Sequence, residues 1–192
     1  MDARINIKIF LKTVILFPLF MIFIMFPLCL LIVITAFVPK GRVLATKLYE
    51  FFGWIGIVLV GVELNVIGAE KIDTKKSYVV IGNHPSTLDI FTHITALPVS
   101  IRFLTKTELF RIPIFGRVLK TLGLPRIDRK NAKANFEKIN DSINQVIKLG
   151  NSIMIFPEGK RSNQKELLPF KKGASHIAKN FNLPIIPVCL LY

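Results

Sequence analysis

The feature that most constrains the fold is an uncharged run near the start of the chain. Val14 to Val38 comprises 25 residues without an acidic or basic side chain, interrupted by Pro18, Pro27 and Thr35. About 20 apolar residues cross the hydrocarbon core of a bilayer, so this run is long enough to span one. It is too long for the core of a signal peptide and lacks a small-residue cleavage site, so we expect it to be retained.

A second apolar run, Phe51 to Val62, has 12 residues and three glycines, which is short for a membrane span. A charged turn, Pro39–Arg42, separates the two runs, and basic residues flank the first run on both sides, so the charges give no orientation. Two interpretations remain: one true span, or a helical hairpin inserted in one leaflet, which we favour slightly. We therefore expect residues 1–62 to form a membrane anchor and residues 63–192 to form a separate α/β domain.

The charge balance indicates an anionic surface or substrate. Lys and Arg number 26 against 12 Asp and Glu, which gives a net charge of +14. Because the chain also has a long apolar segment, this positive charge favours phospholipid headgroups as the anionic partner. The chain contains no motif typical of nucleic-acid binding, so we expect no nucleic-acid partner. The two cysteines, Cys29 and Cys189, do not suggest a disulfide framework and fit a reducing compartment.

After Glu63, short apolar runs alternate with amphipathic ones, a pattern typical of α/β proteins. The spacing predicts helices over Ala132–Leu149, where Gly150 is a natural stop, and over Gly173–Asn180. The expected strands are Leu64–Ile67, Tyr78–Ile81, Ile101–Leu104, Ile153–Phe156 and Ile185–Leu190.

A candidate catalytic pair follows the second of these strands. The residue before a proline avoids the α region, so His84 should lie in a turn, while Pro85 should open a helix that carries Asp89 in its first turn. The imidazole can then fold back to meet the carboxylate, which would hold one tautomer and produce a general base. The alternative is a capping histidine beside a first-turn aspartate.

A polar loop, Phe156–Ser162, follows another strand at the sheet edge where ligands bind in open α/β folds. Arg161 could hold a phosphate with two hydrogen bonds, and Gly159 would let the backbone approach it. The alternative is an ordinary surface loop with an ion pair between Glu158 and Arg161.

Three further cations follow strand ends or turns: Lys106, Arg126 and Arg129. Together with Arg161 they would form one anion pocket if these ends converge; otherwise they are solvated side chains. The segment Leu183–Val188 could line a substrate groove or pack in the core, and Pro187 indicates a sheet edge or a kink.

In combination, these motifs resemble those of the glycerolipid acyltransferase family, and within it the 1-acyl-sn-glycerol-3-phosphate acyltransferases. The resemblance covers Gly68 to Leu190. It rests on Asn83-His84-x4-Asp89, the block Gly123–Arg129, the loop Phe156–Ser162 and Pro184-x-x-Pro187-Val188. The chain departs from the usual pattern at Pro85, Arg126 and Lys160, where Gln, an apolar or aromatic residue, and Thr are common. Two of these changes, Arg126 and Lys160, add positive charge and could alter which acceptor headgroup the protein prefers.

The resemblance implies an α/β fold with a mixed sheet flanked by helices, and acyl transfer from a thioester to the free hydroxyl of 1-acyl-glycerol-3-phosphate. His84 would be the general base, oriented by Asp89. The donor would be acyl-coenzyme A or acyl-carrier protein, and we expect no resident cofactor and no metal. The residues expected to bind phosphate and glycerol are Lys106, Arg126, Arg129, Glu158, Gly159 and Arg161; those expected to line the site are Asn83, Ser86, Pro157 and Pro187.

By the same resemblance, the enzyme would act at a bilayer, in a bacterial inner membrane with its active site on the cytoplasmic face. Three alternatives remain open. The acceptor could be another lysophospholipid or an aminoacyl lipid. The protein could be a metal-dependent hydrolase with His84, Asp89 and Glu158 as ligands, although one histidine and two distant carboxylates make a poor ligand set. It could also be a non-enzymatic protein that binds anionic membranes.

Overall fold

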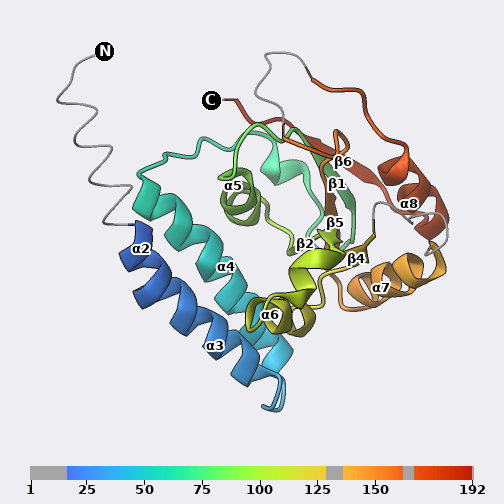
Figure 1. Ribbon diagram of the computed structural model, residues 1–192. Helices are drawn as coiled ribbons and strands as arrows, with labels where there is room; N and C mark the ends of the chain where they lie inside the picture. Colours follow the sequence, from blue (N-terminus) through green and yellow to red (C-terminus); the bar gives the residue numbers. More distant parts are fainter. Residues whose placement is uncertain (1–16, 129–135, 162–166, 192) are drawn as a thin grey trace, which may run out of the picture.

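The computed structural model describes residues 17–128, 136–161 and 167–191, and its centre is a parallel sheet (Figure 1). Four strands lie in the order β2 (Ile101–Phe103), β5 (Ser152–Ile155), β1 (Val79–Gly82) and β6 (Ile185–Val188). The α/β class and the helix-flanked sheet are confirmed. The described strand pairs are all parallel, so the expectation of a mixed sheet is wrong for this part of the chain. The strands are joined by crossovers, which return the chain to the same end of the sheet before each strand begins.

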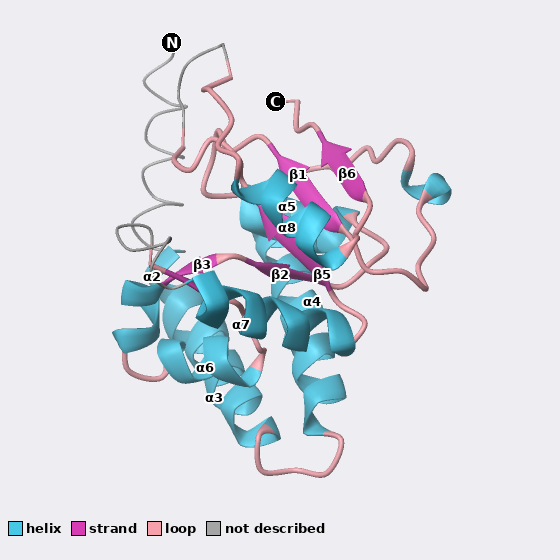
Figure 2. Ribbon diagram, turned by 90° about the vertical axis from the view of Figure 1, so that its right-hand side faces the viewer, coloured by secondary structure: helices cyan, strands magenta, loops and turns pink. Residues whose placement is uncertain are grey.

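The sheet is covered on both faces, as the continuous apolar character of its strands requires. Alternate residues point to opposite faces: Val80 and Met154 lie in one core, and Val79 and Ile153 in the other. Helices α7 (Phe136–Lys148) and α8 (Gly173–Phe181) cover the second face, while α5 (Asp89–Ala96) and α6 (Phe115–Thr121) belong to the side of the first (Figures 1 and 2).

The N-terminal segment forms a helical hairpin. Its first arm contains α2 (Phe17–Phe20), a π-helical turn η2 (Met21–Met25) and α3 (Phe26–Thr35); its second arm is α4 (Gly41–Val60). A Cβ atom at Gly41 would lie 1.7 Å from the carbonyl oxygen of Thr35, so the turn requires glycine there. The helical hairpin agrees with one of the two interpretations from the sequence, but its second arm is a single helix that includes Arg42, which was expected in the turn. Of the described helices, α4 is long and apolar enough to cross a membrane, judged by length and composition.

The hairpin shares a core with the sheet. Ile32 and Tyr49 from its two arms pack in the same cluster as Val80 and Met154. Helix α4 approaches α5 closely because it presents glycine: a Cβ atom at Gly53 would lie 2.4 Å from the Ile94 side chain. A domain division between residues 62 and 63 stays a prediction.

Two further differences from the expected elements concern short segments. Residues 64–67 do not form the expected strand, and Ile67 is 89% exposed, so its side chain is not drawn into a core. A two-stranded parallel sheet of β3 (Thr105–Lys106) and β4 (Arg126–Ile127) was not expected, nor were the short helical turns η3 (Ala69–Lys71) and η4 (Thr107–Arg111). The expected helix over Ala132–Leu149 is α7 in its described part, and residues 132–135 lie outside the described residues.

Candidate active site

His84 and Asp89 meet where β1 ends, as the sequence predicts. The Nδ1 atom of His84 lies 2.6 Å from Oδ2 of Asp89, whose side chain is fully buried. Because a carboxylate accepts, Nδ1 donates, and Nε2 is the nitrogen that can take up a proton from another group. The His84 side chain remains 18% exposed, so a substrate can reach it.

The route by which these residues meet differs from the expected one. Pro85 does not open a helix; α5 begins at Asp89, after an irregular loop. In that loop, Ser86 Oγ accepts a hydrogen bond from the Leu88 amide at 3.1 Å, and Asp89 Oδ2 accepts one from the Ser86 amide at 3.0 Å. Such bonds from side chain to backbone compete with helix formation, which explains the late start. Ser86 therefore helps to fix the carboxylate through its backbone.

Phe156 supports the imidazole of His84 from the end of β5. The two rings are stacked, with centroids 3.9 Å apart and planes inclined by 8°. Strands β1 and β5 are neighbours in the sheet, with Val79 opposite Ile153 and Ile81 opposite Ile155, so their carboxyl ends deliver His84 and Phe156 to the same edge.

Glu158 is buried and holds two backbone segments together, rather than forming a surface ion pair. Its side chain is 5% exposed, and its two carboxylate oxygens accept backbone hydrogen bonds from His84 and Leu168, each at 3.1 Å. The alternative of an ordinary loop with a surface pair between Glu158 and Arg161 is therefore wrong. The bond to the His84 amide ties the end of β5 to the residue that carries the imidazole.

Asn83, Pro157 and Pro187 lie in the backbone segments around the His84–Asp89 pair. The Asn83 amide group donates to the Leu190 carbonyl at 2.9 Å and accepts from the Leu190 amide at 2.8 Å, which closes the loop after β6. Pro187 lies in β6, opposite Ile81, at an edge of the four-stranded sheet, where a residue without an amide proton is tolerated. Pro157 is buried, and its carbonyl accepts from the Lys171 amide at 2.9 Å.

The predicted cations lie on two different parts of the fold. Lys106 and Arg126 are exposed on the adjacent strands β3 and β4, and the Arg126 guanidinium lies over the Phe110 ring at 4.4 Å. Arg161 is exposed after the turn that contains Glu158. Arg129 lies outside the described residues, and the convergence of all four cations on one anion pocket stays a prediction.

Sequence reasoning missed a fifth cation at this loop. Gly159 has a left-handed backbone, with φ of +76°, and a Cβ atom there would lie 2.7 Å from Nζ of Lys171. The ammonium group therefore lies against the same loop that carries Arg161. The signal that could have found it is the pair of lysines directly before the helix that starts at Gly173.

Sequence reasoning also missed a buried cation that joins the hairpin to the sheet. Arg102 in β2 is 2% exposed and donates hydrogen bonds to the Leu122 carbonyl at 2.8 Å and to Thr46 Oγ1 of α4 at 2.7 Å. Burial lowers the pKa of this guanidinium. The role of Arg102 is structural. The sequence feature that could have identified it is a single cation inside an otherwise apolar strand.

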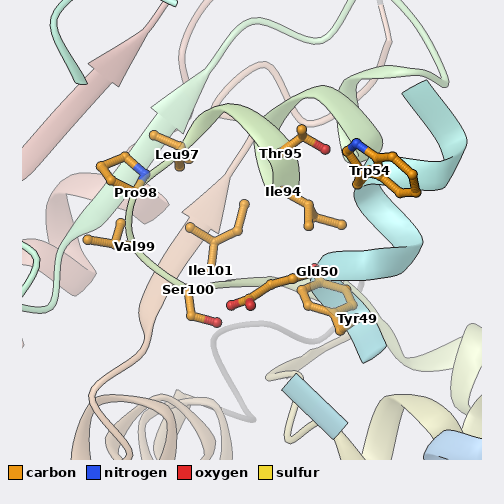
Figure 3. Close-up of a pocket in the computed structure, with 10 residues that line it drawn as sticks. All are labelled: Tyr49, Glu50, Trp54, Ile94, Thr95, Leu97, Pro98, Val99, Ser100 and Ile101. Carbon is orange, nitrogen blue, oxygen red and sulfur yellow. The ribbon is translucent and has the colours of Figure 1, made fainter. Parts of the chain in front are cut away.

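A cavity of about 330 Å³ lies away from His84. It is bounded by Tyr49, Glu50 and Trp54 of α4, by Ile94 of α5 and by the start of β2 at Ile101 (Figure 3). The amino end of β2 is the opposite edge of a parallel sheet from the carboxyl ends that carry the His84 pair, so this cavity is not the candidate active site. Among the described residues, no group of three or more His, Cys, Asp or Glu side chains could hold a metal ion.

Comparison with known proteins gives consistent matches. A family model described as Acyltransferase matches residues 63–191. The 1-acyl-sn-glycerol-3-phosphate acyltransferase of Cocos nucifera is 36% identical over 153 residues, covering 79% of this chain and 49% of that protein. The enzyme of the same name from Saccharomyces cerevisiae is 36% identical over 133 residues, covering 68% of this chain and 44% of that protein.

A solved structure has the same fold. The crystal structure of the 1-acyl-sn-glycerophosphate (LPA) acyltransferase PlsC from Thermotoga maritima matches with a TM-score of 0.64 and 26% identity, covering 81% of this chain and 63% of that one. The chain spans about half the length of the curated relatives it matches. Those two relatives are eukaryotic, which weakens the expectation of a bacterial inner membrane.

Proposed function

Because the chain belongs to the acyltransferase family, we propose that it transfers an acyl group from a thioester to 1-acyl-glycerol-3-phosphate, giving phosphatidic acid. The observation that carries this proposal is the 2.6 Å contact between His84 Nδ1 and Asp89 Oδ2 at the carboxyl end of β1. The acceptor is taken from the names of the relatives, and the donor is acyl-coenzyme A or acyl-carrier protein. No resident cofactor takes part in the proposed reaction.

The proposed reaction begins with deprotonation of the acceptor. Nε2 of His84 takes the proton of the free glycerol hydroxyl as its oxygen attacks the thioester carbonyl, and Asp89 stabilises the imidazolium that forms. The C–S bond then breaks, and the departing thiolate receives the proton back from Nε2. A base positioned in this way contributes about 10²–10⁴-fold to the rate, and the correct placement of two substrates contributes further.

The acceptor's phosphate would bind beside the loop after β5. Arg161 follows Glu158 by three residues, and Glu158 accepts the hydrogen bond of the His84 amide, so a phosphate at Arg161 would lie beside the loop that contacts the base. The other described cations we assign to the acceptor are Lys171, whose ammonium group lies against the same loop, and Lys106 and Arg126 on the small sheet. Arginine suits this role because its planar fork matches two phosphate oxygens.

The helical hairpin would hold the enzyme at a bilayer. Its outer surface carries many exposed apolar side chains, more than isolated surface positions would explain. They include Phe23, Phe26, Leu31 and Ile34 on the first arm, Phe37 in the turn, and Val43, Phe51, Trp54 and Val58 on the second arm. Both the acceptor and the product are lipids, so this surface would bring the active site to them.

An acyl-transfer assay tests the proposal. The purified protein in detergent is given acyl-coenzyme A or acyl-carrier protein with a panel of lysolipids that differ in headgroup, including lysophosphatidate and the uncharged monoacylglycerol. Phosphatidic acid formed from lysophosphatidate in preference to the other products is the expected result. Product from another lysolipid alone would refute the proposed acceptor, and no product from any pair by a folded protein would refute acyl transfer.

A further inference from the structure

We propose that His93 is a positioning residue for the His84–Asp89 pair and works as a neutral imidazole with its proton on Nδ1. The inference rests on the proposed function, because it assigns a role to His93 in that reaction. His93 was not among the residues singled out by sequence, and it does not reach the substrate, since it is fully buried. The role of His93 follows from the three groups that its ring touches.

The first contact is with the backbone of Asp89. His93 follows Asp89 by one turn of α5, and its Nδ1 atom lies 2.6 Å from the Asp89 carbonyl oxygen. A carbonyl oxygen only accepts, so Nδ1 must carry a proton. Thr92 Oγ1 donates to the same oxygen at 3.0 Å. Two side chains therefore fix the main chain of the residue whose carboxylate holds His84.

The second contact is with the end of β1. A Cβ atom at Gly82 would lie 2.6 Å from Nε2 of His93, so the imidazole edge is pressed against this glycine. Gly82 precedes His84 by two residues, and no other residue type fits there without moving the ring. Nε2 has no hydrogen-bond partner among the described residues. A neutral ring tolerates this, because Nε2 then carries no proton, whereas a charged ring would leave a buried N–H unpaired.

The third contact is with Phe156. The His93 ring meets it edge-on, with centroids 5.5 Å apart and planes inclined by 80°, while His84 is stacked on Phe156. His93 thus touches the aspartate backbone, the strand that leads into the base and the ring on which the base rests. Burial is the largest influence on the pKa of His93 and lowers it. A neutral ring adds no second cation beside Asp89.

An alternative is that His93 is only a core residue that stabilises α5. Two substitutions separate the possibilities. His93→Asn retains an N–H at the position of Nδ1 but removes the rest of the ring, whereas His93→Phe retains an aromatic ring and removes the donor. Ile94→Val, at the next buried position, is the control for a loss of packing in the same helix.

The experiment combines kinetics with NMR of ¹⁵N-histidine-labelled protein in detergent. The chain has three histidines, so the spectrum is simple, and His176, exposed on α8, serves as internal reference. In the wild type we expect a neutral His93 protonated on Nδ1 and a downfield proton from the short bond between His84 and Asp89. In His93→Phe we expect that proton to shift or broaden and kcat to fall about 10- to 100-fold with little change in KM, because small misplacements of a catalytic group have effects of this size. His93→Asn should recover part of kcat, and Ile94→Val should leave it within about twofold.

Two results would overturn the proposal. One is a wild-type His93 that is charged or carries its only proton on Nε2. The other is a folded His93→Phe protein that keeps both the downfield proton and kcat. The NMR measurement needs no turnover, so a wild-type protein without acyl transfer would contradict the proposed function while the NMR result still decides the role of His93.

Discussion

Substituting Glu158 should reduce stability and kcat together, because this buried carboxylate holds the backbone of His84. Each of its oxygens accepts one backbone hydrogen bond at 3.1 Å. A partly buried N–H left without its charged acceptor raises the free energy of the folded state by about 1–3 kcal/mol. Glu158→Gln keeps one acceptor and should lower the free energy of unfolding by about 1–3 kcal/mol; Glu158→Ala loses both and should lower it by about 2–6 kcal/mol.

The same change should affect catalysis. Without the bond to its amide, His84 can shift relative to Asp89, and we expect kcat of Glu158→Gln to fall about 10- to 100-fold while KM for the acceptor stays near the wild-type value. Urea unfolding followed by circular dichroism and steady-state acyl transfer measure the two effects. Glu108→Gln, on an exposed position of η4, is the control for loss of one acidic charge. A raised KM with unchanged kcat in Glu158→Gln would refute the role of Glu158 in positioning His84 and would show that Glu158 touches the acceptor.

Three further substitutions test other parts of the account. Lys171→Gln should raise KM for lysophosphatidate several-fold and leave KM for an uncharged monoacylglycerol unchanged. Lys172→Gln, which removes the neighbouring positive charge, should change neither KM value. Equal effects of the two substitutions on KM would show only a loss of general positive charge. Gly82→Ala should destabilise the protein by about 1–3 kcal/mol, measured by urea unfolding, because the added methyl group overlaps a buried imidazole. Phe26→Asp should reduce co-sedimentation with anionic vesicles, whereas Thr74→Asp, exposed on a loop, should reduce it much less; unchanged sedimentation of the first would contradict membrane contact by the hairpin.

The sheet could be predicted from sequence because each of its strands is a short apolar run bounded by turn residues. The strands at Tyr78, Ile101, Ile153 and Ile185 appear within a residue or two of their expected starts. The small sheet of β3 and β4 could not be predicted, because two-residue strands carry no periodicity. The start of α4 was missed for a different reason: its first turns carry basic and acidic side chains, and only packing against α3 and α5 shows them to be helical.

The contact between His84 and Asp89 could also be predicted, because the two residues are close in sequence and a proline constrains the turn between them. The role of Glu158 could not. Its bonds reach the amide of His84, 74 positions earlier in the chain, and that partner follows from the parallel pairing of β1 with β5. His93 was missed because a histidine on a short helix has no spacing signal; its importance depends on Gly82 and Phe156, which belong to two other strand ends.

The most direct test of general-base catalysis by His84 is the rate of phosphatidic acid formation by wild type and His84→Ala. Equal amounts of folded protein, matched by circular dichroism, would be compared in the same detergent with the same acyl thioester and lysophosphatidate. If His84 is the general base, the variant should lose about 10²–10⁴-fold in rate while its secondary structure is unchanged. A folded His84→Ala protein that forms phosphatidic acid within a few-fold of the wild-type rate would contradict the account.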